Sequence, residues 1–394
     1  MSPYTPPAAP DPALPKVVLP PELLPRDGRF GSGPSKVRHE QLDALAANAA
    51  WLGTSHRQAP VQRLVGDLRQ GLSQFFSLPP GYEIVLGNGG ASAFWDIATA
   101  CLVRERAQHV VVGEFSAKFA AATTAAPFLL DPQVRRAGPG SACRAQVIDD
   151  GASVDVYAWP HNETSTGVML PVERVVDAGD DALMVIDGTS GAGGLPIDLS
   201  EADAYYFAPQ KCFGSDGGLW LAVLSPAAIA RADEIATHND AAGGRWIPGI
   251  LDLRAAIENS RKDQTLNTPA LATVLLMLEQ VRWLNELGGL AWAVARCEES
   301  ARIVYDWAHA SDYARPFVAH EPARSRVVTT IDIAGTVDAG AITSILRGHG
   351  IVDLEPYRKL GRNQLRIGVY PAVEPSDVAA LTRCIDAVVA ALRA

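Results

Sequence analysis

The sequence has 394 residues, of which 48% are hydrophobic and 20% charged, a composition typical of a globular protein with a substantial core. Its length predicts two or three domains, and its formal net charge of −10 argues against nucleic acid as the main partner. No apolar run is long enough to span a bilayer and the N-terminus does not resemble a signal peptide, so we expect no membrane association and a cytoplasmic protein.

The first half of the chain alternates strand and helix patterns after a proline-rich start. Residues 1–30 hold many prolines and predict an extended N-terminal arm. Short apolar runs bounded by Gly, Pro and Asp predict strands at 83–86, 109–112, 154–158, 183–186, 204–208 and 219–224. This alternation predicts an α/β fold with a mostly parallel, doubly wound sheet.

The character of the sequence changes after Gly249. A helix is expected to open at Thr268, as its N-cap, followed by Pro269 at the first helical position. From 286 to 394 helical and strand patterns predict a smaller α+β domain, against which the arm 1–30 packs. The large domain is then expected to span residues 31–285.

Two of the predicted strands end on a charged residue. The strand 183–186 is followed by Asp187, and the strand 204–208 leads to Lys211. In open α/β sheets, ligands bind beyond the carboxyl ends of the strands. A lysine there can form a Schiff base and an aspartate can keep a pyridine nitrogen protonated, which suggests pyridoxal 5'-phosphate as cofactor. Each residue alone is more readily explained as a turn residue, a helix cap or a solvated rim charge, and only the other stretches below reverse this balance.

A glycine-rich loop, 87–92, stands between a strand and a helix. Its backbone N–H groups and the helix N-terminus suit a phosphate, and Ser92 adds a hydroxyl. A dinucleotide fingerprint is a rival reading, with Glu114 as its acid, and a plain strand-to-helix turn is the third. Phe115 follows the next strand, where it can stack on a flat ring or pack in the core.

Two further stretches offer positive charge. His56 and Arg57 follow a helix and can donate hydrogen bonds to a carboxylate or phosphate. Arg366 interrupts an apolar strand, which is costly unless its charge is paired, by a substrate carboxylate or by a structural acid.

The cysteines suggest neither a disulfide framework nor a zinc site. They are five, scattered and without a CxxC pair: Cys101, Cys143, Cys212, Cys297 and Cys384. We therefore expect no metal and a reduced cytoplasm.

Taken together, the chain resembles the phosphoserine aminotransferase family, class V enzymes of fold type I that use pyridoxal 5'-phosphate. The resemblance is carried by residues 55–57, 162–164 with Gly167, 187, 210–211 and 267–269. It runs over nearly the whole chain, and the order of these stretches makes it specific.

The resemblance implies a role for each candidate residue. Lys211 would form the Schiff base and shuttle the proton, and Asp187 would face the pyridine nitrogen. Thr164 would bond the phenolic oxygen side of the cofactor and Phe115, where many members have Trp, would stack on its ring. The phosphate would be held by Ala91, Ser92 and Gln210 and, from the other subunit, by Asn267 and Thr268. A homodimer with shared active sites follows.

The same resemblance implies that His56, Arg57 and Arg366 bind the substrate anions. Many members carry a Gly-His-Arg segment shortly before the last arginine, whereas here the residues are different but still basic. Which of Arg358, Lys359 and Arg362 contacts a substrate phosphate therefore stays open.

The implied reaction converts L-glutamate and 3-phosphohydroxypyruvate, a phosphorylated 2-oxo acid, to 2-oxoglutarate and O-phospho-L-serine in serine biosynthesis. The four-carbon phosphorylated analogue, used in vitamin B6 synthesis, is a further substrate in the family. The alternatives are another class V aminotransferase, such as the alanine–glyoxylate type, and a nicotinamide-dependent dehydrogenase using the Gly87 loop.

Overall fold

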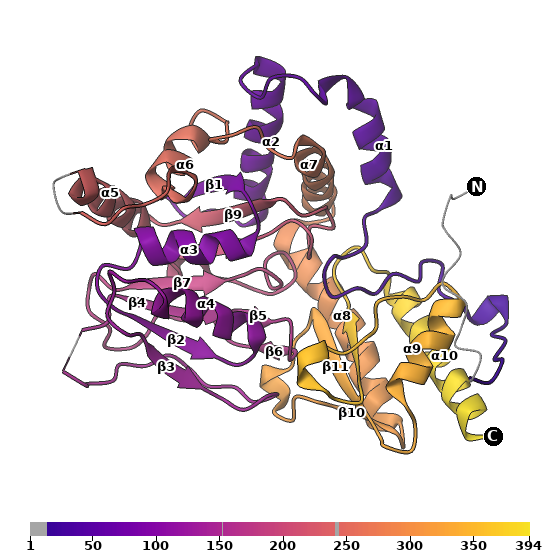
Figure 1. Ribbon diagram of the computed structural model, residues 1–394. Helices are drawn as coiled ribbons and strands as arrows, with labels where there is room; N and C mark the ends of the chain where they lie inside the picture. The colour runs from indigo at the N-terminus through magenta and orange to yellow at the C-terminus, as the bar shows by residue number, and fades with distance from the viewer. Residues whose placement is uncertain (1–13, 152, 241–243) are drawn as a thin grey trace.

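The computed structural model describes residues 14–151, 153–240 and 244–394, so the first 13 residues of the expected arm lie outside it. A large sheet with its helices and a smaller sheet with its own helices lie side by side (Figure 1). Among the described helices, none combines the length and the apolar character needed to cross a membrane.

Seven strands form the large sheet, in the order β1-β9-β8-β7-β4-β2-β3. They are β1 (Glu83–Asn88), β2 (Ala107–Val111), β3 (Gln133–Arg136), β4 (Val156–Pro160), β7 (Leu183–Asp187), β8 (Ala204–Phe207) and β9 (Leu219–Leu224). The strands from β8 to β3 pair in parallel, whereas β9 is antiparallel to both β8 and β1. The predicted α/β fold with a mostly parallel sheet is confirmed.

Helices cover both faces of this sheet, because successive strand side chains point to opposite sides. Ile84 and Leu86 pack in one core with α2 (Ala59–Phe75) and α7 (Leu271–Glu286). Val85, between them, packs in the other core. That second core holds side chains of α3 (Ala91–Cys101), α4 (Glu114–Thr124), α5 (Pro226–Asp240) and α6 (Leu253–Ser260). Burial on both faces is why the central strands are continuous apolar runs.

The short elements around the large sheet connect its main helices and strands. They are α1 (His39–Ala47), η2 (Ala49–Trp51), β5 (Asn162–Glu163), β6 (Val168–Met169), η3 (Leu199–Glu201) and η4 (Gly249–Leu251). Of these, β5 and β6 form a small antiparallel pair directly after β4.

The second sheet has three antiparallel strands in the order β10-β11-β12. Its elements are α8 (Gly289–Ala310), β10 (Ala314–Pro316), η5 (Glu321–Ala323), β11 (Val328–Ile333), α9 (Ala339–Gly348), η6 (Arg358–Leu360), β12 (Gln364–Gly368) and α10 (Pro375–Arg393). Leu19 and Phe30 of the arm, which includes η1 (Pro21–Leu23), are buried in the core of this sheet. The domain boundaries at residues 30 and 285 stay a prediction.

The helix expected to open at Thr268 begins later. Its N-cap is Ala270 and its first residue is Leu271. The Thr268 hydroxyl hydrogen-bonds His56 Nδ1 (3.2 Å) and so does not cap the helix. The capping prediction was therefore wrong. The hydroxyl of the expected cap, Thr268, instead contacts His56, which lies 212 residues earlier in the chain.

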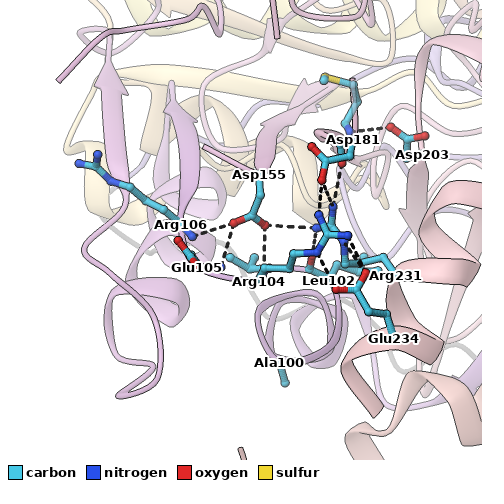
Figure 2. A network of polar contacts seen from close by, with 12 residues as sticks. Ala100, Leu102, Arg104, Glu105, Arg106, Asp155, Asp181, Asp203, Arg231 and Glu234 are labelled. Atoms are coloured by element: carbon cyan, nitrogen blue, oxygen red, sulfur yellow. Dashed lines mark hydrogen bonds and ion pairs between the residues drawn. The ribbon is translucent and has the colours of Figure 1, made fainter. Parts of the chain in front are cut away.

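A polar network ties together the amino ends of β2 and β4 and helix α5 (Figure 2). Asp155, just before β4, accepts the backbone N–H groups of Arg104, Glu105 and Arg106 (2.8–2.9 Å). Its carboxylate also lies 3.2 Å from Arg231 Nη1, whose side chain is only 2% exposed. One carboxylate thus joins the turn before β2, the start of β4 and helix α5.

This network predicts a large stability loss for Asp155→Ala. The change leaves the buried Arg231 without its nearest carboxylate, and three N–H groups without their acceptor. We expect the free energy of unfolding to fall by about 3 to 5 kcal/mol in urea denaturation. Asp181, whose side chain is 71% exposed, also faces Arg231, and Asp181→Ala should cost less than about 1 kcal/mol. Equal losses for the two variants would contradict this account.

Candidate functional site

The carboxyl ends of the large sheet's strands bring the main predicted residues to one edge. β1, β2, β4, β7 and β8 all run in the same direction. Asp187 is the last residue of β7, and the residues that follow the ends of the other strands include Ala91, Phe115, Thr164 and Lys211. Such an edge is where open α/β sheets bind ligands.

Asp187 is a buried carboxylate held by neutral donors. It accepts hydrogen bonds from Trp95 Nε1 (3.3 Å) and from the Thr189 backbone N–H (2.8 Å). Burial raises the pKa of Asp187, and the hydrogen bonds of Thr189, Tyr206 and Trp95 oppose that rise. Within the described residues, no basic side chain lies within ion-pair distance of this carboxylate. A ligand that brings a positive group would stabilise its charge.

Lys211 is the second buried charge at this edge, in the segment that follows the neighbouring strand β8. Its ammonium group donates to the Ser32 carbonyl oxygen (2.8 Å). Gly33, at φ +134°, leaves room for it, because a Cβ there would lie 1.9 Å from Nζ. Burial, and then the charge of Arg366, lower the pKa of Lys211 to about 8. A sizeable fraction of this amine is therefore neutral near physiological pH and able to act as nucleophile or base.

The glycine loop places a helix N-terminus close to Asp187. Helix α3 begins at Ala91, and its N-cap Gly90 supplies no side-chain cap to the first N–H groups. Ser92 is exposed, and one turn on, Trp95 reaches Asp187. Gln210 adds a side-chain oxygen, Oε1, that is buried without a hydrogen-bond partner among the described residues. Free N–H groups at this position suit an anion such as phosphate.

The turn after β5 supports Thr164 and Phe115 together. Thr164 Oγ1 donates to Ser190 Oγ (2.8 Å), and both residues are buried. The fully buried Glu163 carboxylate accepts the backbone N–H groups of Phe115 (3.3 Å) and Ser116 (2.9 Å). The buried Glu163 carboxylate thus fixes the position of Phe115. Glu163 belongs to the stretch 162–164, which is one of those that carry the family resemblance.

Arg366 extends from β12 of the small sheet toward the same edge. Its Nη1 donates to the Thr164 carbonyl oxygen (3.3 Å), and its Nε is buried without a partner among the described residues. Burial lowers its pKa. Within the described ranges no carboxylate lies within ion-pair distance of this guanidinium, so the structural acid that would pair it is missing. The guanidinium is available for a substrate carboxylate.

A second group of predicted residues lies together, apart from Lys211. Arg57 Nη1 donates to Gln264 Oε1 (2.6 Å), and His56 bonds Thr268, whose carbonyl oxygen accepts from Asn88 Nδ2 (3.1 Å). Burial, and then Arg57, lower the pKa of His56. Asn267 and Thr268 are exposed. No hydrogen bond or ion pair between described residues joins this group to Lys211 or Asp187, but Asn88 connects it to the glycine loop.

The three cations left open by the sequence have different surroundings. Lys359 forms an ion pair with Glu114. Arg362 forms two hydrogen bonds to Asp332 (2.5 and 3.0 Å). Arg358 is exposed and has no hydrogen bond or ion pair to a residue that the structure describes. Of the three, Arg358 is thus the one whose charge no described acid neutralises.

Several residues of the site did not stand out in the sequence. Trp95 and Ser32 contact the two buried charges, and the Tyr370 hydroxyl donates to the same Ser32 carbonyl (2.8 Å). Trp95 lies four residues after Ala91, so helical spacing from the glycine loop is the one signal that points to it. A backbone carbonyl such as that of Ser32 leaves no signal in the sequence.

The residues present fit pyridoxal 5'-phosphate. The site combines a buried amine of lowered pKa, a buried carboxylate lacking a cation, and an uncapped helix N-terminus. A buried polar atom without a partner among the described residues, Gln210 Oε1, lies in the segment that follows β8. Unpaired polar groups of this kind are costly unless a ligand pairs them.

Comparisons with known proteins agree with this chemistry. A family model described as aminotransferase class-V matches residues 34–352. A phosphoserine aminotransferase from Nocardioides sp. is 59% identical over 373 residues, covering 94% of this chain and 98% of that protein. A crystal structure of a phosphoserine aminotransferase from Cytophaga hutchinsonii has a TM-score of 0.81 and 22% identity, over 91% of this chain and 99% of that one. A phosphoserine aminotransferase from Trichomonas vaginalis, crystallised with pyridoxal 5'-phosphate bound, has a TM-score of 0.74 and 19% identity, over 92% of this chain and 100% of that one.

The lowered pKa of Lys211 predicts how cofactor uptake depends on pH. Only the neutral amine reacts with an aldehyde, so the rate at which cofactor-free protein takes up pyridoxal 5'-phosphate should rise with a midpoint near pH 8. Removing the nearby positive charge with Arg366→Met should move this midpoint to higher pH. Arg362→Met is the control, because Asp332 already neutralises that charge. A midpoint near pH 10, the value of an ordinary lysine, would count against the assignment.

Proposed function

The chain belongs to the class V aminotransferase family, and on this premise we propose that it moves the amino group of L-glutamate to 3-phosphohydroxypyruvate. The products are 2-oxoglutarate and O-phospho-L-serine, as in serine biosynthesis. The observation that carries the proposal is the 59% identity, over nearly the full length of both chains, to a phosphoserine aminotransferase. The four-carbon phosphorylated analogue is a second proposed substrate. The dehydrogenase alternative finds no support in the family match.

Pyridoxal 5'-phosphate is the cofactor of this enzyme. In our proposal the N-terminus of α3, at Ala91 and Ser92, holds its phosphate together with Gln210. Phe115 stacks on its ring, and Thr164 bonds its phenolic side. When bound, the cofactor supplies a conjugated ring that delocalises the electrons left behind as the substrate α-proton leaves.

Asp187 and Lys211 are the two side chains proposed to hold and transfer protons in the reaction. Asp187 holds a proton on the pyridine nitrogen, because its buried carboxylate has no other cation to pair with among the described residues. Lys211 would hold the cofactor through its amine and would move a proton to and from the substrate at Nζ. A pKa near 8 suits both directions of that transfer near neutral pH.

Arg366 binds the carboxylate of both substrates in this proposal. The support is its partner-free Nε and the absence of an acid within ion-pair distance in the described part of the chain. A guanidinium can bind a carboxylate through two parallel hydrogen bonds, which fixes the substrate's orientation as well as its position. One pocket then receives the amino donor and the 2-oxo acid acceptor in turn, so we expect ping-pong kinetics.

We further propose a homodimer with shared sites. The support is that His56, Arg57, Asn267 and Thr268 gather at one place without contacting Lys211 of their own chain. Across a two-fold axis the same residues would reach the partner's site. A monomeric mass in sedimentation at micromolar concentration would contradict this. The cytoplasmic location stays a prediction.

Lys211→Ala tests the site directly. The purified variant should lack the visible absorbance that the bound cofactor shows when attached to lysine, because the amine proposed to attach it is gone. Lys262→Ala, at an exposed lysine, should keep the absorbance of the wild type. An undiminished visible band in Lys211→Ala would refute the assignment of Lys211.

Comparing keto acids separates the proposed reaction from an alanine–glyoxylate type. With L-glutamate as donor, kcat/KM should be at least about 100-fold higher for 3-phosphohydroxypyruvate than for hydroxypyruvate or glyoxylate, since a site built for phosphate leaves cations unpaired without it. Steady-state rates measured side by side decide this. Similar values for all three acids would favour the alternative.

A further inference from the structure

Tyr357 connects two of the proposed site residues, although it belongs to the small domain's side of the fold. It directly precedes η6 and is partly buried. Its ring lies against that of Phe115, with centroids 5.7 Å apart and planes at 63°. The Arg366 guanidinium carbon lies 5.5 Å from the Tyr357 ring centroid. One aromatic ring therefore touches both the residue proposed to stack on the cofactor and the residue proposed to bind the substrate carboxylate.

Arg366 has few other contacts that fix its orientation. Its hydrogen bond to the Thr164 carbonyl oxygen is long, at 3.3 Å, and its Nε has no partner among the described residues. A single long hydrogen bond leaves a planar guanidinium free to turn about it. The aromatic face of Tyr357 supplies a second contact, which is favourable because the guanidinium is cationic and largely buried.

Tyr357 is itself held against the large domain at two points. Phe115 is fixed by its backbone hydrogen bond to Glu163 Oε1 (3.3 Å), and Lys359, two residues after Tyr357, forms an ion pair with Glu114. Glu163 directly precedes Thr164. Both contacts of Arg366 thus lead back to the same turn after β5, one directly and one through the two aromatic rings.

We propose that Tyr357 is a positioning residue, whose ring holds the Arg366 guanidinium in the orientation that receives the substrate carboxylate. The ring and not the hydroxyl does this, because the Tyr357 hydroxyl forms no hydrogen bond to a described residue. The inference rests on the proposed function only in taking Arg366 as the carboxylate-binding residue. The substrate phosphate plays no part in it.

Replacing Tyr357 by Leu and by Phe tests the proposal. The holoenzyme of Tyr357→Leu should bind 2-oxoglutarate about fivefold to tenfold more weakly in calorimetry, with the KM for L-glutamate raised to a similar degree and kcat within about twofold. Tyr357→Phe keeps the ring and should behave like the wild type. Tyr82→Leu, which removes a partly buried tyrosine before β1, is the matched control and should leave 2-oxoglutarate binding unchanged.

A double variant separates orientation of Arg366 from support of the loop. Adding Tyr357→Leu to Arg366→Met should cause no further loss of 2-oxoglutarate affinity, because the ring acts through that guanidinium. Unchanged affinity in Tyr357→Leu, equal losses in the Leu and Phe variants, or additive losses in the double variant would each overturn the proposal. If Tyr357→Leu does not fold, Tyr357→Met takes its place. If the wild type uses another amino donor, the proposed function fails. The KM for that donor, compared between Tyr357→Leu and the wild type, still decides the role of Tyr357.

Discussion

Two buried, oppositely charged groups at the ends of neighbouring strands are the constraint on which the rest of this structure depends. Asp187 ends β7 and Lys211 follows β8, and both side chains are more than nine-tenths buried. Burial favours the neutral form of both, because it raises the pKa of Asp187 and lowers that of Lys211. In our proposal, the ring nitrogen and the carbonyl carbon of the cofactor offset both penalties, because one pairs with the carboxylate and the other reacts with the amine.

The remaining architecture serves to keep these groups in place. Parallel pairing of β4, β7 and β8 brings their ends to one edge, and the Asp155 network fixes the opposite, amino edge (Figure 2). The small domain then adds Arg366 from its own sheet, directed toward the large domain by Thr164 and Tyr357. In our proposal, the catalytic groups come from the large sheet and the guanidinium that orients the substrate comes from the small one, so the relative position of the two sheets would control substrate alignment.

The prediction of a helix start at Thr268 failed because contacts between residues distant in the sequence outweighed the local preference for helix capping. Thr268-Pro269 carries the local pattern of a helix start, yet the Thr268 hydroxyl bonds His56 and the helix begins at Leu271. Strand β3, Gln133–Arg136, has no apolar pattern and was not expected, because an edge strand with half-exposed polar side chains needs none. The sequence pattern also did not predict whether β9 runs parallel or antiparallel to β8. The helix-free link between the two strands is typical of antiparallel neighbours.

The sequence by itself determined the α/β class, the positions of the central strands and the family. Buried strands appear in the sequence as continuous apolar runs, and the charged residues at their ends can be recognised from the neighbouring residues alone. The roles of the proposed site residues remain predictions, but the structure shows which of them meet. Only the tertiary structure decided that Arg366 has no acidic partner among the described residues, that Lys359 and Arg362 are paired with Glu114 and Asp332, and that Tyr357 touches both Phe115 and Arg366. These contacts join residues up to 245 positions apart, and no local pattern encodes a pairing between such distant segments.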